Sequence, residues 1–178
     1  MMLPGSEREE AVLGGPMGRA ADMFATVLCK ELNRLGEEAE TSITWKCGGP
    51  INSGHECVDV TGRHGERPKV LVEIELRRQT PLANIVKIWK WIDGGKLRKE
   101  NITVIQAFSR YYQGRKHDPR MDNAKFIGKQ MRKITGAKYI PMELPFRPGK
   151  GAKKGGGARQ KQAKKLASQI LEELGSRI

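Results

Sequence analysis

Three acidic residues in the first half of the chain have the types and spacing to hold a metal ion. Asp59 is followed, after thirteen intervening residues, by Glu73 and Glu75 in the segment VEIEL. Alternate side chains of a β-strand point to the same face, so Glu73 and Glu75 should project together and Ile74 to the other face. Two carboxylates on an apolar strand repel each other and lose solvation, and a bound cation offsets both costs. Because Mg²⁺ prefers carboxylate oxygens, we expect a Mg²⁺ (or Mn²⁺) site here.

The residues that follow this segment allow two interpretations. Arg77, Arg78 and Gln79 come directly after the acidic strand. Guanidinium groups bind phosphate bidentately, so these residues could contact the phosphates of a nucleic acid beside the metal. Alternatively, the arginines neutralise Glu73 and Glu75, or the glutamates face solvent at the end of the strand. Both interpretations remain open on the sequence alone.

Hydrophobic patterning places the acidic segment on a central strand of an α/β fold with a mixed sheet. Val70, Leu71 and Val72 form an unbroken apolar run, as expected of a strand buried on both faces. Thr80 suits the cap of the next helix and Pro81 its first position. Periodicity and turn residues predict helix 17–38, strands 41–46, 55–61 and 69–76, helix 81–92, strand 101–109, helix 120–134, strand 138–144 and helix 160–174.

The same patterning divides the chain into three parts. Residues 1–16 are expected to form a flexible arm, residues 17–145 one α/β domain, and residues 146–178 a basic tether with a C-terminal helix. Leu166, Ile170 and Leu174 lie along one side of that helix and are a candidate contact for a homodimer. No apolar run approaches the roughly 20 residues of a membrane span, and the N-terminus has no apolar signal core. We therefore expect a cytoplasmic protein that does not enter a membrane.

Charge is distributed unevenly along the chain. The 33 Lys/Arg and 20 Asp/Glu residues give a net charge of +13. Residues 1–75 carry 8 Lys/Arg and 13 Asp/Glu, a net charge of −5, whereas residues 76–178 carry 25 and 7, a net charge of +18. The basic half indicates a polyanionic partner, because phosphate contacts release counterions. The acidic half would repel that partner unless some of its carboxylates hold metal ions.

Two basic segments are candidates for contact with nucleic acid. The loop after strand 101–109 mixes cations with aromatic rings, which suits contacts with the backbone and stacking on bases. It could equally be a soluble loop whose tyrosines are packed down. Residues 147–165 have eight Lys/Arg and no acidic residue, a composition that binds polyanions without reading their sequence. The candidates are Arg110, Tyr111, Arg115 and Lys116 in the loop, and Lys153 and Lys154 in the tail.

The order αβββαβ, with Asp59 followed by Glu73-Ile74-Glu75 on a hydrophobic strand, resembles the PD-(D/E)xK nuclease superfamily, which includes restriction endonucleases and Holliday-junction resolvases. The resemblance spans residues 17–145 and implies a restriction-endonuclease-like core that hydrolyses DNA with divalent metal ions. It makes Asp59 and Glu73 the metal ligands, together with the Ile74 or a neighbouring carbonyl. Glu31 is the candidate for the acidic residue that the family commonly has on its first helix, although a buried salt bridge would explain it equally well.

Glu75 departs from the family pattern, because it stands where lysine is usual. Some restriction enzymes of the superfamily carry the same E-x-E substitution. The role of the lysine could pass to Glu75 as a general base, to a metal-bound water, or to a lysine from the next helix. Lys87 lies one turn after Asn84 on one side of that helix, where either could instead contact nucleic acid.

The resulting hypothesis is a Mg²⁺-dependent DNA endonuclease of the restriction, junction-resolving or repair type, with Asp59, Glu73, Glu75 and Lys87 as catalytic residues. Two other hypotheses remain open. One is a non-catalytic nucleic-acid-binding protein on the same fold, in which Glu75 marks lost activity. The other is a basic RNA-associated protein whose carboxylates are structural.

Overall fold

The computed structural model describes residues 16–48, 51, 57–77, 80–97, 101–112, 118–144 and 156–175. Within these ranges the chain is α/β with one mixed sheet, which confirms the predicted fold class. The elements are α1 (Pro16–Glu38), β1 (Thr44–Cys47), β2 (Val60–His64), β3 (Arg67–Glu75), α2 (Leu82–Asp93), β4 (Thr103–Ser109), α3 (Pro119–Thr135), β5 (Lys138–Leu144) and α4 (Gly156–Gly175).

The described strands lie in the order β1-β2-β3-β4-β5. β1, β2 and β3 are antiparallel neighbours, whereas β3, β4 and β5 run parallel to one another. β3 therefore lies at the centre, between the antiparallel and the parallel halves of the sheet. Its residues 70–75 are all buried, as the unbroken apolar run predicts for a central strand.

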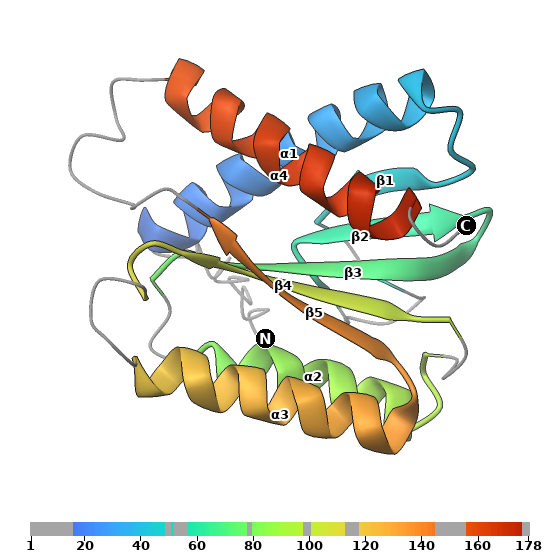
Figure 1. Ribbon diagram of the computed structural model, residues 1–178, viewed down its shortest axis with the longest axis vertical. Coiled ribbons are helices and arrows are strands. Elements are labelled where there is room, and N and C mark those ends of the chain that lie inside the picture. Colours follow the sequence, from blue (N-terminus) through green and yellow to red (C-terminus); the bar gives the residue numbers. More distant parts are fainter. Residues whose placement is uncertain are drawn as a thin grey trace, which may run out of the picture.

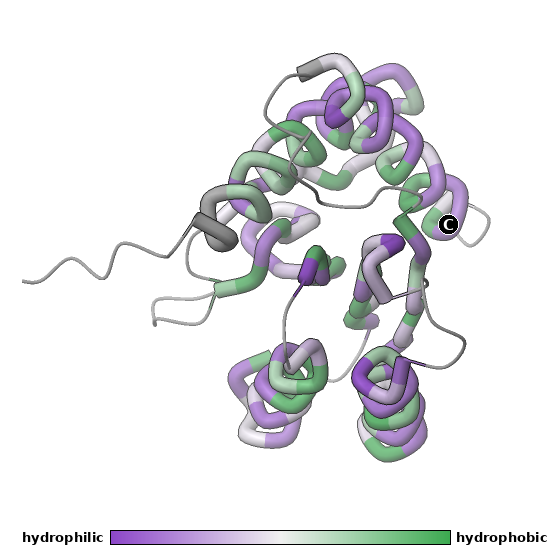
Figure 2. Tube along the Cα trace, turned by 90° about the vertical axis from the view of Figure 1, so that its left-hand side faces the viewer, coloured by the Kyte–Doolittle hydropathy of each residue, from purple (hydrophilic) through white to green (hydrophobic). Residues whose placement is uncertain are grey.

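Two layers of helices cover the sheet, with α1 and α4 on one face and α2 and α3 on the other (Figures 1 and 2). Val70, Val72 and Ile74 pack toward α1 and α4, while Leu71 packs toward α2 and α3. Glu73 and Glu75 alternate with the first set and so face α2 and α3. Each helix begins at the edge of the sheet where β3, β4 and β5 end (Figure 1). We call this edge the carboxyl edge.

α4 belongs to the same folded unit as the sheet. Leu166 and Ile170 are buried in the core shared with α1, and Leu174 packs partly buried against it. The predicted apolar stripe is thus real, but it lies inside the chain's own core. Leu166 and Ile170 are therefore unavailable as the candidate homodimer contact, because a buried side chain cannot reach a second protomer. No helix within the described ranges combines the length and apolarity needed to cross a membrane.

The hairpin of β2 and β3 differs from the prediction of a strand at 55–61 and a loop at 62–68. β2 is Val60–His64, and the turn is Gly65-Glu66, where Gly65 has a φ of 57° that favours glycine. Position 62 of β2 is a glycine because the ring of Trp45 occupies the space that a side chain would need. A Cβ there would lie 2.8 Å from Trp45 Cζ3. Gly62, which was expected to lie in the loop after the strand, therefore lies inside β2 and makes room for the Trp45 ring.

The helices on the other face begin and end close to their predicted bounds. Pro81 occupies the N-cap of α2 and makes no side-chain capping bond, so the prediction of Thr80 as the cap is wrong by one residue. Asp118 caps α3 by accepting a hydrogen bond from the Arg120 N–H at 3.0 Å. Gly136, with a φ of 76°, ends α3 as predicted.

Candidate active site

Asp59 lies immediately before β2, and its carboxylate is fixed against β3. Its Oδ2 accepts a hydrogen bond of 2.6 Å from the backbone N–H of Ile74. Because Val60 pairs with Val72 in the antiparallel register, Asp59 comes beside the end of β3 that carries Glu73. The hairpin therefore brings Asp59 and Glu73, the two predicted metal ligands, to one place beside β3.

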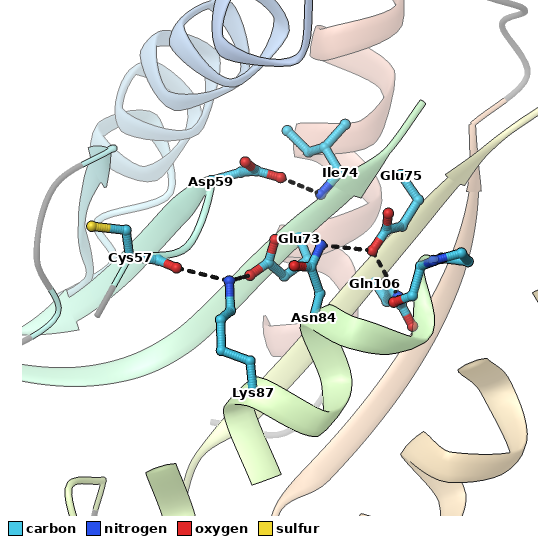
Figure 3. Close-up of polar contacts among 9 residues, drawn as sticks. Cys57, Asp59, Glu73, Ile74, Glu75, Asn84, Lys87 and Gln106 are labelled. Atoms are coloured by element: carbon cyan, nitrogen blue, oxygen red, sulfur yellow. Dashed lines mark hydrogen bonds and ion pairs between the residues drawn. The ribbon is translucent and has the colours of Figure 1, made fainter. Parts of the chain in front are cut away.

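Glu73 receives a lysine from α2. Lys87 Nζ donates to Glu73 Oε1 at 2.7 Å and to the backbone carbonyl of Cys57 at 2.9 Å (Figure 3). The Glu73 side chain is 1% exposed and that of Lys87 is 33% exposed. The alternative in which a lysine arrives from the next helix is thus met geometrically, since Lys87 reaches the acidic strand.

These side chains line one cavity of about 310 Å³ at the carboxyl edge. α1, the end of β1, the segment before β2, β3 and α2 all contribute to its wall. The lining residues are Asp22, Ala25, Thr26, Cys47, Gly48, Cys57, Val58, Asp59, Glu73 and Lys87. Five segments thus enclose a small space that holds the buried carboxylate of Glu73, the half-buried one of Asp59, the exposed one of Asp22 and the ammonium of Lys87.

The acidic residue that α1 contributes to the cavity is Asp22, not Glu31. Glu31 Oε2 instead accepts from Arg34 at 3.0 Å, the salt bridge that the sequence left as the alternative, and Glu31 does not line the cavity. Glu31 follows Asp22 by nine positions, about two and a half turns, so the two side chains point to opposite sides of the helix.

Burial and a neighbouring charge shift the titration of Glu73. Desolvation is the largest influence, followed by the negative charge of Asp59, and together they raise the pKa of Glu73 to about 8. The charge and hydrogen bond of Lys87 act in the opposite direction but do not cancel them. Burial and the charge of Asp59 thus disfavour the ionised form of Glu73 despite Lys87, and a proton or a cation offsets that cost.

The donor set fits a hard divalent cation in part. No three Cys, His, Asp or Glu side chains come together as a metal-binding group in the described part of the chain. Mg²⁺ needs fewer protein ligands than this, because it keeps several of its waters and is held through one or two carboxylates and the phosphates of its substrate. Asp59 and Glu73 supply two carboxylates, and a bound cation would offset the cost of ionising the buried Glu73.

Glu75 shares the face of Glu73 but does not line the cavity. It is 0% exposed, and its Oε1 accepts from Asn84 Nδ2 and from Gln106 Nε2, each at 2.9 Å (Figure 3). Gln106 Nε2 also donates to the carbonyl of Pro81, and Gln106 Oε1 accepts from Tyr139 O–H at 2.9 Å. Asn84, predicted to contact nucleic acid, is 3% exposed and binds Glu75 instead, so this prediction is not supported by its position.

A cluster of guanidinium and aromatic groups lies at the carboxyl edge beyond the cavity. Arg77 and Arg120 place their guanidinium carbons 5.0 and 5.4 Å from the ring centroid of Tyr111. Arg120, and secondarily Arg77, lower the pKa of Tyr111. Tyr112 is fully buried and packs edge-on against Tyr111 at 5.4 Å. Tyr112 is thus packed in the core, whereas the Tyr111 ring contacts the guanidinium groups of Arg77 and Arg120.

The sequence analysis did not predict a role for Arg120 in this cluster, because position 120 was expected only to begin a helix. Arg110 is exposed beside the cluster. Six predicted nucleic-acid-binding residues lie outside the described residues: Arg78, Gln79, Arg115, Lys116, Lys153 and Lys154.

A comparison of the sequence with models of known protein families and with curated protein sequences finds no match.

Proposed function

We propose that the protein is a Mg²⁺- or Mn²⁺-dependent DNA endonuclease of the PD-(D/E)xK type that hydrolyses phosphodiester bonds. The observation that carries this proposal is the convergence of Asp59, Glu73 and Lys87 on one cavity at the carboxyl edge. Two carboxylates and one ammonium, drawn from a hairpin and the following helix, suit metal-assisted phosphodiester hydrolysis, because the carboxylates can hold the ion and the ammonium can contact a phosphate oxygen or water.

Asp59 and Glu73 would hold the metal ion, which when bound supplies Lewis-acid stabilisation of the phosphate and lowers the pKa of water. The N–H of Ile74 fixes the Asp59 carboxylate, so its other oxygen is oriented by the backbone of β3. Lys87 has three N–H donors, of which two are used on Glu73 and Cys57. The third can orient the attacking water or bind a non-bridging phosphate oxygen.

The guanidinium cluster supports nucleic acid as the substrate. Arg77 lies two residues after the end of β3, so a phosphate chain that crosses the cavity would come within reach of it. Arg120 begins α3 at the same edge, where the positive end of the helix dipole also favours phosphate. These contacts address the backbone and not the bases, and they supply affinity without sequence specificity.

The test is cleavage of supercoiled plasmid with Mg²⁺, with Mn²⁺ and with EDTA. Asp59→Asn, Glu73→Gln and Lys87→Ala should each lower the rate by roughly 100-fold or more, since each removes a group that acts at the reacting phosphate. Lys90→Ala and Asp93→Asn are matched controls, because both residues are exposed on α2 and lie outside the cavity.

Two outcomes would reject the proposal. One is intact plasmid, and intact branched DNA, at every metal condition. The other is cleavage that persists in Glu73→Gln, which would indicate a contaminating nuclease. Salt-sensitive binding of DNA without cleavage would favour the non-catalytic alternative, and preferential binding of RNA without metal would favour the RNA-associated one.

A further inference from the structure

We infer that Glu75 is a positioning residue, whose buried carboxylate anchors the start of α2 to the sheet and so sets Lys87 on Glu73. The inference rests on the proposed function for its catalytic consequence, but the anchoring itself is a property of the fold. Glu75 stands where the resemblance would place a lysine, and in this chain the lysine comes from α2 instead. An acidic residue at position 75 then acts through Lys87 and not on the substrate.

The first step is the burial of Glu75 among donors. Its side chain lies between β3, β4 and α2 with none of its surface exposed, so it cannot touch a substrate in the cavity. A carboxylate buried in this way is retained only where hydrogen-bond donors surround it. Asn84 and Gln106 supply two such donors to a single oxygen, each at 2.9 Å (Figure 3).

The second step is the direction that the carboxylate imposes on its neighbours. Glu75 Oε1 accepts a hydrogen bond from each amide, so both amides turn their NH₂ groups toward it. Gln106 then presents its Oε1 to the Tyr139 hydroxyl, and its Nε2 also reaches the Pro81 carbonyl. One acceptor on β3 thus fixes side chains from β4, β5 and α2 in a single arrangement.

The third step links this arrangement to Lys87. Pro81 and Asn84 belong to the first turn of α2, and both are held by the network, one through its carbonyl and one through its side chain. Lys87 follows Asn84 by three residues, about 4.5 Å along the helix axis. Its ammonium can meet both Glu73 and the Cys57 carbonyl only if α2 starts at this height and rotation relative to β3.

The test makes two measurements on a pair of Glu75 variants: the rate at which Lys87 is acylated and the rate of DNA cleavage. Glu75→Gln keeps an oxygen that can accept both amide N–H groups, whereas Glu75→Leu keeps the volume but no acceptor. Lys87 acylation by an amine-reactive ester is followed by peptide mass spectrometry, with exposed Lys90 on the same helix as the internal reference. Melting curves and circular dichroism establish that each variant is folded.

We expect Lys87 to react slowly relative to Lys90 in the wild type and in Glu75→Gln, and at least roughly tenfold faster in folded Glu75→Leu. The plasmid cleavage rate at saturating DNA should fall by roughly 10- to 100-fold in Glu75→Leu with little change in the KM for DNA, because a displaced lysine affects the reaction more than substrate binding. Glu75→Gln should restore most of that rate.

The outcomes separate the alternatives. If Glu75→Gln is as inactive as Glu75→Leu while Lys87 stays protected, Glu75 takes part in the chemistry and the inference is overturned; unchanged Lys87 reactivity in Glu75→Leu also overturns it. If the wild type cleaves no DNA but Glu75→Leu still exposes Lys87, the anchoring stands and only the proposed function fails. Should Glu75→Leu not fold, Asn84→Ala removes the side-chain contact of α2 with Glu75 but keeps the one at the Pro81 carbonyl, and it must still increase Lys87 reactivity relative to Lys90.

Discussion

At the scale of single residues, Glu73 couples the cavity to the stability of the whole chain. Its pKa is about 8 in the folded protein and near 4.5 when unfolded. The folded state therefore binds the proton more tightly, so the stabilising contribution is complete below about pH 4.5 and is lost as pH rises to about 8. In the metal-free protein, this carboxyl makes the fold less stable at pH 8 than at pH 5.

Replacing Glu73 with Gln should remove that dependence. We expect the Tm of the metal-free wild type to fall more between pH 5 and pH 8 than the Tm of Glu73→Gln does, as measured by differential scanning calorimetry. Addition of Mg²⁺ at pH 8 should raise the Tm of the wild type and not that of the variant, since the cation replaces the lost proton. Equal pH slopes in the two proteins would contradict the assigned titration.

The sequence predicted which residues of β3 point together but not what surrounds them. Alternation along a strand is a local rule, so the shared face of Glu73 and Glu75 followed from it. The roles of Asn84 and Gln106 depend on a register between strands and a helix that no short segment encodes. Glu31 and Asp22 illustrate the same limit, because both are acidic residues of α1 and only the packing of α1 decides which one meets the cavity.

At the scale of elements, α3 and the sheet approach each other at one glycine. A Cβ on Gly128 would lie 2.3 Å from Cζ of Tyr139, closer than two such atoms can come. Gly128→Ala should therefore lower the free energy of unfolding by about 1–3 kcal/mol despite the better helix propensity of alanine. Chemical denaturation measures this change, and Gly128→Ala combined with Tyr139→Leu should recover part of the loss.

Asp118 has two separable roles at the start of α3. It caps the helix and forms a salt bridge with Arg120 at 2.7 Å. Asp118→Ala should cost about 1 kcal/mol of stability through loss of the cap, whereas Asp118→Asn keeps an acceptor there and should cost less. Both changes remove the carboxylate from Arg120, so both should tighten DNA binding in a fluorescence anisotropy titration. If only Asp118→Ala alters affinity, the salt bridge does not restrain Arg120.

Most elements could be predicted because their signals are local. β5 matches its predicted range, and Gly136 ends α3 as expected of a glycine after an amphipathic helix. β2 could not be predicted correctly, because Gly62 resembles a turn residue and its actual reason is the ring of Trp45 on a neighbouring strand. Pairing across strands, and not the composition of either one, decides that boundary.

At the scale of the whole molecule, the net charge of +13 matters for DNA binding only through where the lysines lie relative to the cavity. Exposed Lys161 and Lys164 lie in the first half of α4, on the helix that begins at the carboxyl edge, whereas Lys69 and Lys138 lie where β3 and β5 begin, at the opposite edge. A DNA chain bound across the cavity should contact the first pair and not the second.

The salt dependence of DNA binding tests this arrangement. Each phosphate contact contributes about 0.9 to the slope of log K against log salt concentration. The double change Lys161→Ala/Lys164→Ala should therefore reduce the slope by up to about 2 units. Lys69→Ala/Lys138→Ala removes the same charge and should leave the slope nearly unchanged. Equal effects of the two double variants would mean that only the total charge matters.

The contacts that build the site differ in the sequence separation of the residues that they join. Asp59 and Ile74 are 15 residues apart, and Glu73 and Lys87 are 14 apart, whereas Glu75 and Gln106 are 31 apart and Gln106 and Tyr139 are 33 apart. Short loops close first, so the acidic pair and its lysine can meet on a nascent chain before β4 and β5 have left the ribosome. Pulsed hydrogen exchange during refolding should accordingly find β2 and β3 protected ahead of β5. The groups proposed for catalysis would thus assemble early, and the network that fixes their geometry would form last.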